Sequence, residues 1–257
     1  MYEAKFDQRG SVVRWTESGG RSDGAGAASV YVHGLGAMSS VYHAHIAAAP
    51  ALSGRRSLLV DLPGHGISDR PQEFGYTLED HADALAAALD GAGVRGADLI
   101  GHSMGGAVAI VLAHRRPELV RRLVLTEANL DPYPPVTAGS SGIAGLSEEE
   151  FVHGGGFARV LARVGPAWAA TMRLADPLAL HRTATGLVRG TDPTMRRMLM
   201  ESPAERVYLQ GALSGELPGR EELMGAGVRV ETVPEAGHVL MFDRPDALVR
   251  AVAERPA

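Results

Sequence analysis

Six short runs of consecutive apolar residues recur along the chain and alternate with segments of helical periodicity. The runs are rich in Val, Leu and Ile and lie at 29–34, 57–64, 97–103, 122–127, 206–211 and 228–233. Strands that are apolar throughout are typical of a parallel sheet covered on both faces. The pattern therefore predicts an open, doubly wound, mostly parallel α/β sheet.

Two further segments precede these runs, at 3–8 (EAKFDQ) and 11–17 (SVVRWTE). We expect them to pair antiparallel at one edge, which makes the predicted sheet eight-stranded. In such sheets the functional sites lie at the carboxyl ends of the strands.

Two helices are predicted with well-marked ends. Residues 76–94 place leucines and alanines at helical spacing, and Gly91 is a plausible C-cap. Residues 104–116 follow the third buried run and end before Pro117, which cannot continue a helix.

One long interval, 128–203, carries no strand pattern, and helix starts dominate it. Ser147 and Glu150 have the spacing of a capping box, while Asp176 and Asp192 each precede a proline at what would be the first helical position.

This interval is predicted to be a helical lid inserted into the core domain. The boundaries are therefore 1–127 and 204–257 for the core and 128–203 for the lid. We call segment 128–203 the insertion from here on.

Composition and charge narrow the class of protein. With 257 residues and 45% hydrophobic content, the chain can bury a large core, and its net charge of −5 gives no basic field for nucleic acid. There is no cysteine, which excludes disulfides, thiolate metal sites and cysteine nucleophiles.

The start of the chain resembles no signal peptide, and no apolar stretch reaches about 18 residues. We expect a cytoplasmic protein without membrane or nucleic-acid partners, and leave its oligomeric state open.

The sequence GHSMGG (101–106) follows a buried strand and opens a helix. A G-x-S-x-G match has meaning only in this setting, where small residues allow a tight turn that raises the serine above the sheet. Ser103 is therefore the predicted nucleophile, and Met104 offers a backbone N–H for an oxyanion.

A serine hydroxyl requires a base to accept its proton. His238 lies in a loop after the last predicted strand, at the sheet edge where Ser103 emerges. A second oxyanion donor is expected in the turn HGLG (33–36), where we favour the N–H of Leu35 and keep Gly34 as the alternative.

Taken together, HGLG, DLPGHGISDRP, GHSMGG and AGHVLMFDRPD stand in the order found in α/β-hydrolases, and the chain resembles that superfamily over nearly its whole length outside the insertion. The resemblance implies a serine esterase or lactonase, in which His65 of the second motif is structural. The remaining histidines show no recurring metal-ligand spacing, so we expect neither a metal nor another cofactor.

The third member of a triad is less obvious, because in most of the superfamily the acid follows the strand at 206–211. The expected position falls near Ser214, which has no carboxylate. Haloalkane dehalogenases and some lidded lactonases instead carry an acid after the preceding strand, which here is Glu127. We predict a Ser103–His238–Glu127 triad, with Glu216 and Asp131 as alternative acids.

A serine at this position favours acyl transfer, because dehalogenases of the superfamily use an aspartate nucleophile. The predicted substrate is a hydrophobic ester or lactone, bound against Trp168, Phe157 and Met198 of the insertion. A carbon–carbon bond hydrolase or cofactor-free peroxidase on the same triad is the first alternative, and a non-hydrolytic ligand-binding or biosynthetic homologue is the second.

Overall fold

The computed structural model describes residues 1–20, 28–132 and 142–254. Its centre is an eight-stranded sheet in the order β1-β2-β4-β3-β5-β6-β7-β8. The strands are β1 (Tyr2–Lys5), β2 (Val12–Ser18), β3 (Ser29–Val32), β4 (Ser57–Asp61), β5 (Ala97–His102), β6 (Val120–Thr126), β7 (Glu205–Gly211) and β8 (Arg229–Val233). From β4 to β8 across the sheet all neighbours are parallel, which confirms the predicted fold class.

The two N-terminal strands form the predicted antiparallel edge. β1 pairs with β2, which in turn pairs antiparallel with β4. Tyr2 lies opposite Trp15, and their rings stack with centroids 5.9 Å apart. This cross-strand pair covers one face of the sheet edge with aromatic surface.

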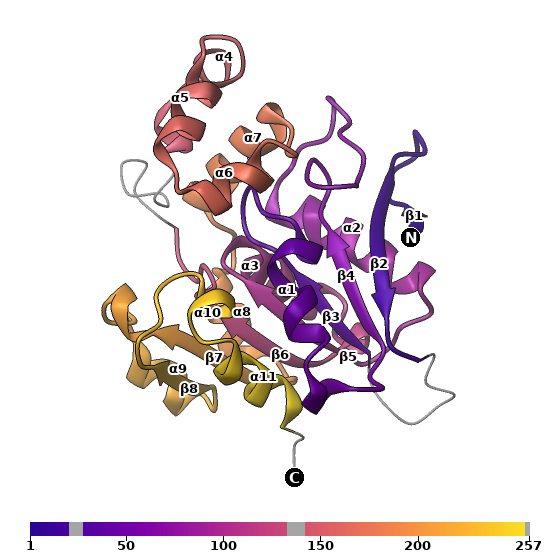
Figure 1. The fold of residues 1–257 in the computed structure, drawn as a ribbon, viewed down its shortest axis with the longest axis vertical. Helices are drawn as coiled ribbons and strands as arrows, with labels where there is room; N and C mark the ends of the chain where they lie inside the picture. The colour runs from indigo at the N-terminus through magenta and orange to yellow at the C-terminus, as the bar shows by residue number, and fades with distance from the viewer. Residues whose placement is uncertain (21–27, 133–141, 255–257) are drawn as a thin grey trace.

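Helices cover both faces of the sheet (Figure 1). On one face, α2 (Leu78–Gly91), α3 (Met104–Arg115) and α8 (Met195–Glu201) share a hydrophobic cluster with the strands. On the other, α1 (Ser39–Ala47), α10 (Leu240–Asp243) and α11 (Pro245–Ala253) share a second cluster. A short helix, α9 (Arg220–Gly225), joins β7 to β8 and buries Leu223 in the first cluster.

The ends of α2 show which local signals determine a helix. Thr77 accepts a hydrogen bond from Asp80 N–H, and the Asp80 carboxylate accepts one from Thr77 N–H. At the other end Gly91 is still helical, and it is Gly93 that adopts the left-handed conformation, with φ 64°. Val94 N–H bonds the Leu89 carbonyl and Gly93 N–H bonds the Asp90 carbonyl, which is a Schellman motif. The helix therefore ends at Gly91 as expected, but its C-cap is Ala92 and the left-handed glycine of the motif is Gly93.

The described part of the insertion is helical and contains no strand. It comprises α4 (Glu148–Val152), α5 (Gly156–Arg163), α6 (Pro166–Met172), α7 (Pro177–Arg189) and α8. Figure 1 shows α4 to α7 grouped at the top of the molecule. Residues from Ile143 to Ala184 form their own hydrophobic cluster, whereas Met195, Met198 and Leu199 of α8 belong to the core cluster. The insertion therefore divides into a separate group of helices and a helix that packs on α3.

The predicted helix starts in the insertion have different outcomes. Ser147 and Asp176 accept bonds from the N–H groups of Glu150 and Ala179, as expected of N-caps. The helix expected to start at Asp192 begins later, because Thr194 is the N-cap and its hydroxyl accepts from Arg197 N–H. Among the described residues, no helix is both long enough and apolar enough to cross a membrane.

Candidate active site

Ser103 lies at a strained turn between β5 and α3. Its backbone has φ 52° and ψ −120°, outside the regions that a residue with a side chain normally adopts. The turn depends on glycine, because a Cβ on Gly101 would lie 2.7 Å from Gly106 Cα and one on Gly105 would lie 2.4 Å from the His33 carbonyl oxygen. The Ser103 N–H donates to the Thr126 carbonyl at 2.9 Å, which ties the turn to β6.

The Ser103 hydroxyl donates a long hydrogen bond to the side-chain oxygen of Asn129, at 3.4 Å. The Asn129 N–H also approaches the Ser103 carbonyl at 3.4 Å. Asn129 lies two residues beyond Glu127 in the chain, and we did not anticipate it from the sequence. A single asparagine in a loop gives no signal of its own, and only the turn after Glu127 brings it beside the serine.

His238 lies in the loop between β8 and α10, and its side chain is 53% exposed. Two contacts hold the loop: Gly237 N–H donates to the Asp243 carboxylate at 2.8 Å, and the His238 carbonyl accepts from His102 Nε2 at 2.9 Å. The rings of His102 and His238 lie 4.9 Å apart. Burial lowers the pKa of His102 well below its usual value, which keeps this ring a neutral Nε2–H donor.

Glu127 follows β6 and faces His238. One carboxylate oxygen accepts a 2.6 Å hydrogen bond from Gly211 N–H at the end of β7, and the other lies 3.7 Å from His238 Nδ1. The latter distance is an ion-pair separation and too long for a hydrogen bond. The side chain is 11% exposed, and its own N–H bonds the Leu209 carbonyl at 3.1 Å. Glu127 therefore reaches the sheet position after β7, where the usual acid is missing.

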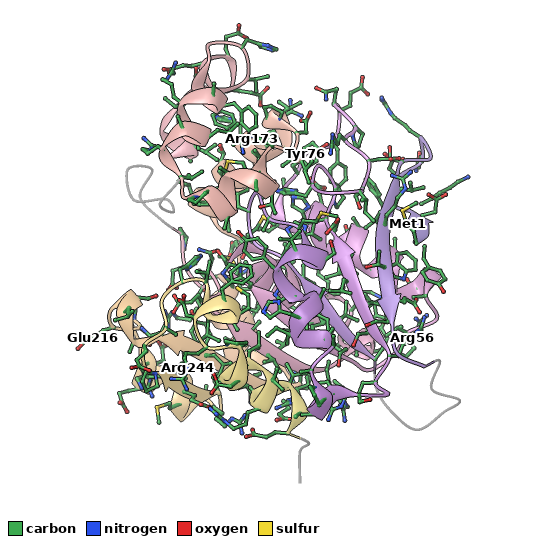
Figure 2. All side chains as sticks on the ribbon, viewed as in Figure 1. Met1, Arg56, Tyr76, Arg173, Glu216 and Arg244 are labelled. Atoms are coloured by element: carbon green, nitrogen blue, oxygen red, sulfur yellow. The ribbon has the colours of Figure 1, made fainter. Side chains whose placement is uncertain are left out.

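The alternative acids are placed elsewhere. The Asp131 carboxylate is bound by the Arg196 guanidinium, with a shortest distance of 2.6 Å. Glu216 is exposed, and Figure 2 shows it at the outer edge of the molecule, pointing away from the ribbon. Ser214 is also exposed, at the end of a short 3-10 turn after β7. Of the three carboxylates considered, Glu127 is the one paired with His238.

The loop after β3 passes directly beside Ser103. A Cβ on Gly34 would lie 3.3 Å from Ser103 Cβ. The Gly34 carbonyl accepts from His33 Nδ1 at 2.7 Å and from Ala37 N–H at 3.1 Å, while His33 Nε2 accepts from Leu62 N–H at 3.0 Å. Burial lowers the pKa of His33 to about 4, so it holds the loop as a neutral ring. We call residues 34–37 the oxyanion loop.

Met104 follows Ser103 in the chain, and Leu35 follows Gly34, which lies beside the serine. Met104 is the first residue of α3, where backbone N–H groups have no partner inside the helix. Leu35 lies next to Gly34 and is partly buried between two hydrophobic clusters. Their assignment as oxyanion donors stays a prediction.

Of the three residues expected to contact substrate, Trp168 and Phe157 pack against the hydrophobic cluster of the insertion, whereas Met198 does not. Trp168 Nε1 donates a 2.8 Å hydrogen bond to the Leu35 carbonyl, and Phe157 packs edge-on against Phe151, with centroids 5.9 Å apart. Met198 is 5% exposed and belongs to the core cluster with α3. We therefore leave Met198 out of the proposed pocket, because packing against α3 explains it fully.

The other histidine singled out in the sequence has a structural environment. His65 is fully buried, and its Nδ1 donates to the Pro63 carbonyl at 3.1 Å. Its ring lies 5.0 Å from that of His33. Within the described residues, no group of three or more histidine or acidic side chains is arranged to hold a metal ion.

Comparison with known proteins finds hydrolases among the relatives of this chain. The 2-hydroxymuconate semialdehyde hydrolase of Pseudomonas sp. strain CF600 is 35% identical over 125 residues, which span 48% of this chain and 44% of that relative. The chain thus matches less than half of that protein's length.

Two solved structures align over nearly the whole chain. An esterase from Thermogutta terrifontis superposes with a TM-score of 0.76 at 20% identity, covering 98% of this chain and 96% of that one. Est816, described as an N-acyl homoserine lactone degrading enzyme, superposes with a TM-score of 0.71 at 19% identity and covers 98% of both chains. The family model of the alpha/beta hydrolase fold matches residues 30–218, from β3 to beyond β7. The chain therefore belongs to the α/β-hydrolase family.

Proposed function

We propose that the protein is a serine hydrolase that cleaves a carboxylic ester, with hydrophobic esters and lactones as its substrate class. The observation that carries the proposal is the strained Ser103 at the carboxyl edge of the sheet, with the Glu127–His238 pair 3.7 Å apart at the same edge. Strain of this kind is retained at sites where it positions a reacting group.

In the proposed reaction, Ser103 Oγ attacks the carbonyl carbon and His238 accepts the serine proton. Glu127 orients the His238 ring and stabilises the imidazolium that forms. The N–H groups of Leu35 and Met104 bind the oxyanion of the tetrahedral intermediate. His238 then protonates the departing alcohol, and a water molecule hydrolyses the acyl-enzyme, which returns the proton to Ser103.

Two contacts of the resting geometry must change before this reaction. The serine proton is shared with Asn129 rather than His238, and the Glu127–His238 contact is long. Rotation of the Ser103 side chain exchanges one partner for the other, and the exposed His238 ring can move toward both. Catalytic hydrogen bonds commonly shorten when substrate binds.

A fluorophosphonate probe tests the proposal directly. The serine oxygen displaces fluoride from phosphorus, so mass spectrometry of the labelled protein should place the adduct on Ser103. The Ser103→Ala variant should lose both the label and ester hydrolysis. Absence of label on the wild-type protein, or equal labelling of Ser103→Ala, would contradict the proposal.

Comparison of a γ-lactone with the p-nitrophenyl ester of the same acyl length then addresses the substrate. Lactone turnover should match or exceed ester turnover if the protein is a lactonase. Hydrolysis of the linear ester alone would restrict the proposal to an esterase. Ser103→Ala serves as the background control for both substrates.

A carbon–carbon bond hydrolase is the second candidate. It is favoured by the similarity to 2-hydroxymuconate semialdehyde hydrolase, because the compound in that name contains no ester bond. The same serine and histidine would serve this reaction. Turnover of 2-hydroxymuconate semialdehyde, followed by loss of its absorbance, together with inactivity toward esters, would support this candidate over the first.

A further inference from the structure

Helix α6 of the insertion contacts the oxyanion loop at two adjacent residues. Trp168 Nε1 donates a 2.8 Å hydrogen bond to the Leu35 carbonyl. The next residue, Gly36, is packed so closely that a Cβ there would lie 3.0 Å from Met172 Cε and 3.1 Å from Trp168 Nε1. These contacts join a helix that is distant in sequence to the turn beside Ser103.

A third contact joins α6 to the helix that follows the loop. The Tyr42 side chain of α1 lies near Thr171 of α6, and both residues are 3% exposed. Met172 is fully buried and approaches Gly36, and Leu35 packs against both the core cluster and the cluster of the insertion. Helix α6 therefore lies against Leu35, Gly36 and Tyr42.

Two consecutive peptide groups of the oxyanion loop are held by different parts of the molecule. The Gly34 carbonyl is bound by His33 and Ala37, which belong to the core domain, and this holds the plane that carries the Leu35 N–H. The next plane, which carries the Leu35 carbonyl and the Gly36 N–H, is held by Trp168 of α6. Among the described residues, the core supplies no hydrogen bond to this second plane.

The second plane requires such a restraint because Gly36 is conformationally permissive. It has φ 68°, and a glycine adopts the region of positive φ about as readily as negative φ. Without the indole N–H, the Leu35–Gly36 peptide can rotate, and Leu35 changes conformation with it. A carbonyl oxygen that turns toward Ser103 would repel the oxyanion that the adjacent N–H should bind.

We propose that Trp168 is a positioning residue whose indole N–H holds the Leu35–Gly36 peptide, so that docking of α6 completes the oxyanion hole. This inference rests on the proposed function for its catalytic consequence. It also changes the role of Trp168, because the polar edge of the ring binds the loop and only its apolar face is left for substrate.

NMR of the protein without substrate tests the structural step. Trp15 and Trp168 are the two tryptophans of the chain, so Trp168→Phe assigns the indole resonances by loss of one. The Trp168 indole proton should exchange slowly with solvent. In Trp168→Phe, the amide resonances of Leu35 and Gly36 should shift or broaden, whereas in Val160→Ala they should not.

Val160 is a suitable control because it is 2% exposed in the same cluster of the insertion, and its side chain makes no polar contact. Val160→Ala therefore weakens packing without removing the hydrogen bond. Unchanged Leu35 and Gly36 resonances in a folded Trp168→Phe protein would overturn the inference, whatever the activity of the protein.

A transition-state analogue tests the catalytic step. Phenylboronic acid forms a bond between boron and Ser103 Oγ, the serine proton passes to His238, and the boronate becomes tetrahedral and anionic. Trp168→Phe should weaken boronate binding and lower kcat for p-nitrophenyl butyrate by about tenfold each, less than the 10²–10³-fold loss from deletion of one oxyanion donor. KM and butyrate binding should change less than twofold.

A simple pocket-wall role predicts the opposite pattern, with a raised KM and weaker butyrate binding at unchanged kcat. That result would overturn the inference while leaving the proposed hydrolase function intact. Failure of the wild-type protein to bind phenylboronic acid or to react with the fluorophosphonate would instead count against the proposed function, and the NMR comparison would still decide the role of Trp168.

Discussion

Glu127 has a backbone conformation that few glutamates adopt, with φ 50°. A residue with a side chain in the left-handed region costs about 1–2 kcal/mol. Here the conformation directs one carboxylate oxygen to Gly211 N–H and the other toward His238. Ser103 has a similar φ of 52° one strand away. Both strained residues lie at the carboxyl edge of the sheet, where a reaction would take place.

Replacement of Glu127 by glutamine separates its chemistry from its packing. The amide retains the size of the side chain but loses the charge that would stabilise protonated His238, so kcat for an ester should fall by about 10²–10⁴-fold. Glu216→Gln should stay within twofold of wild type, because Glu216 is exposed on the outer edge. Steady-state kinetics measure both. Equal and small losses in the two variants would show that Glu127 is not the acid.

The sequence could identify the residues of the site that carry a local signal. Ser103 lies in a glycine-rich turn, His238 in a loop after the last strand, and Glu127 is a charge at the end of an apolar strand. Asn129 and the role of Trp168 could not be found, because each acts through a contact made by chain folding. The distance between Trp168 and Leu35 in the sequence is 133 residues.

At the scale of elements, the strands were predictable because burial on both faces leaves an unbroken apolar run. The capping glycine of α2 was not, since Gly91 ends the helix, Gly93 lies two residues beyond it, and composition does not distinguish their roles. Gly93 adopts φ 64° because the Schellman hydrogen bonds require a left-handed residue at that position, while Gly91 stays helical. The choice depends on where the last helical hydrogen bond forms.

A pair of glycine substitutions tests the assignment of Gly93 as the left-handed residue after α2. A Cβ on Gly93 would meet nothing within 4 Å, so Gly93→Ala adds only backbone strain and should destabilise the protein by about 1 kcal/mol. Gly225 is also unobstructed but lies in α9 without positive φ. Gly225→Ala should stabilise by about 0.5–1 kcal/mol, because alanine favours the helix. Urea denaturation measures both, and changes of the same sign would contradict the assignment.

At the scale of the whole molecule, buried neutral histidines link stability to pH. Burial is the largest cause of a lowered pKa at His33, His43, His65, His81 and His102. The pKa falls to about 4 for His33 and to about 3 for His43 and His65. Asp61 has the opposite effect, because burial raises its pKa to about 6 and the folded protein then binds one extra proton.

The sign of the pH dependence follows from these shifts. Below an unfolded-state histidine pKa near 6.5, the unfolded chain binds protons that the folded protein excludes, so stability is present above about pH 6.5 and falls as the pH is lowered. On unfolding, each of the five histidines takes up one proton and Asp61 releases one, so the net uptake is about four protons. Each proton bound only in the unfolded state changes the free energy of unfolding by ~1.4 kcal/mol per pH unit. Urea unfolding should therefore require much less denaturant at pH 5 than at pH 7.

His43 offers the sharpest variant for this test, because both of its ring nitrogens are buried without a hydrogen-bond partner. Leucine can fill a similar volume without a group that takes up a proton, so His43→Leu should lower the pH slope by about one proton, ~1.4 kcal/mol per pH unit. Its unfolding free energy should exceed that of wild type at pH 5 by more than at pH 7. Parallel pH profiles for the two proteins would mean that His43 does not titrate on unfolding, and that the acid sensitivity arises elsewhere in the fold.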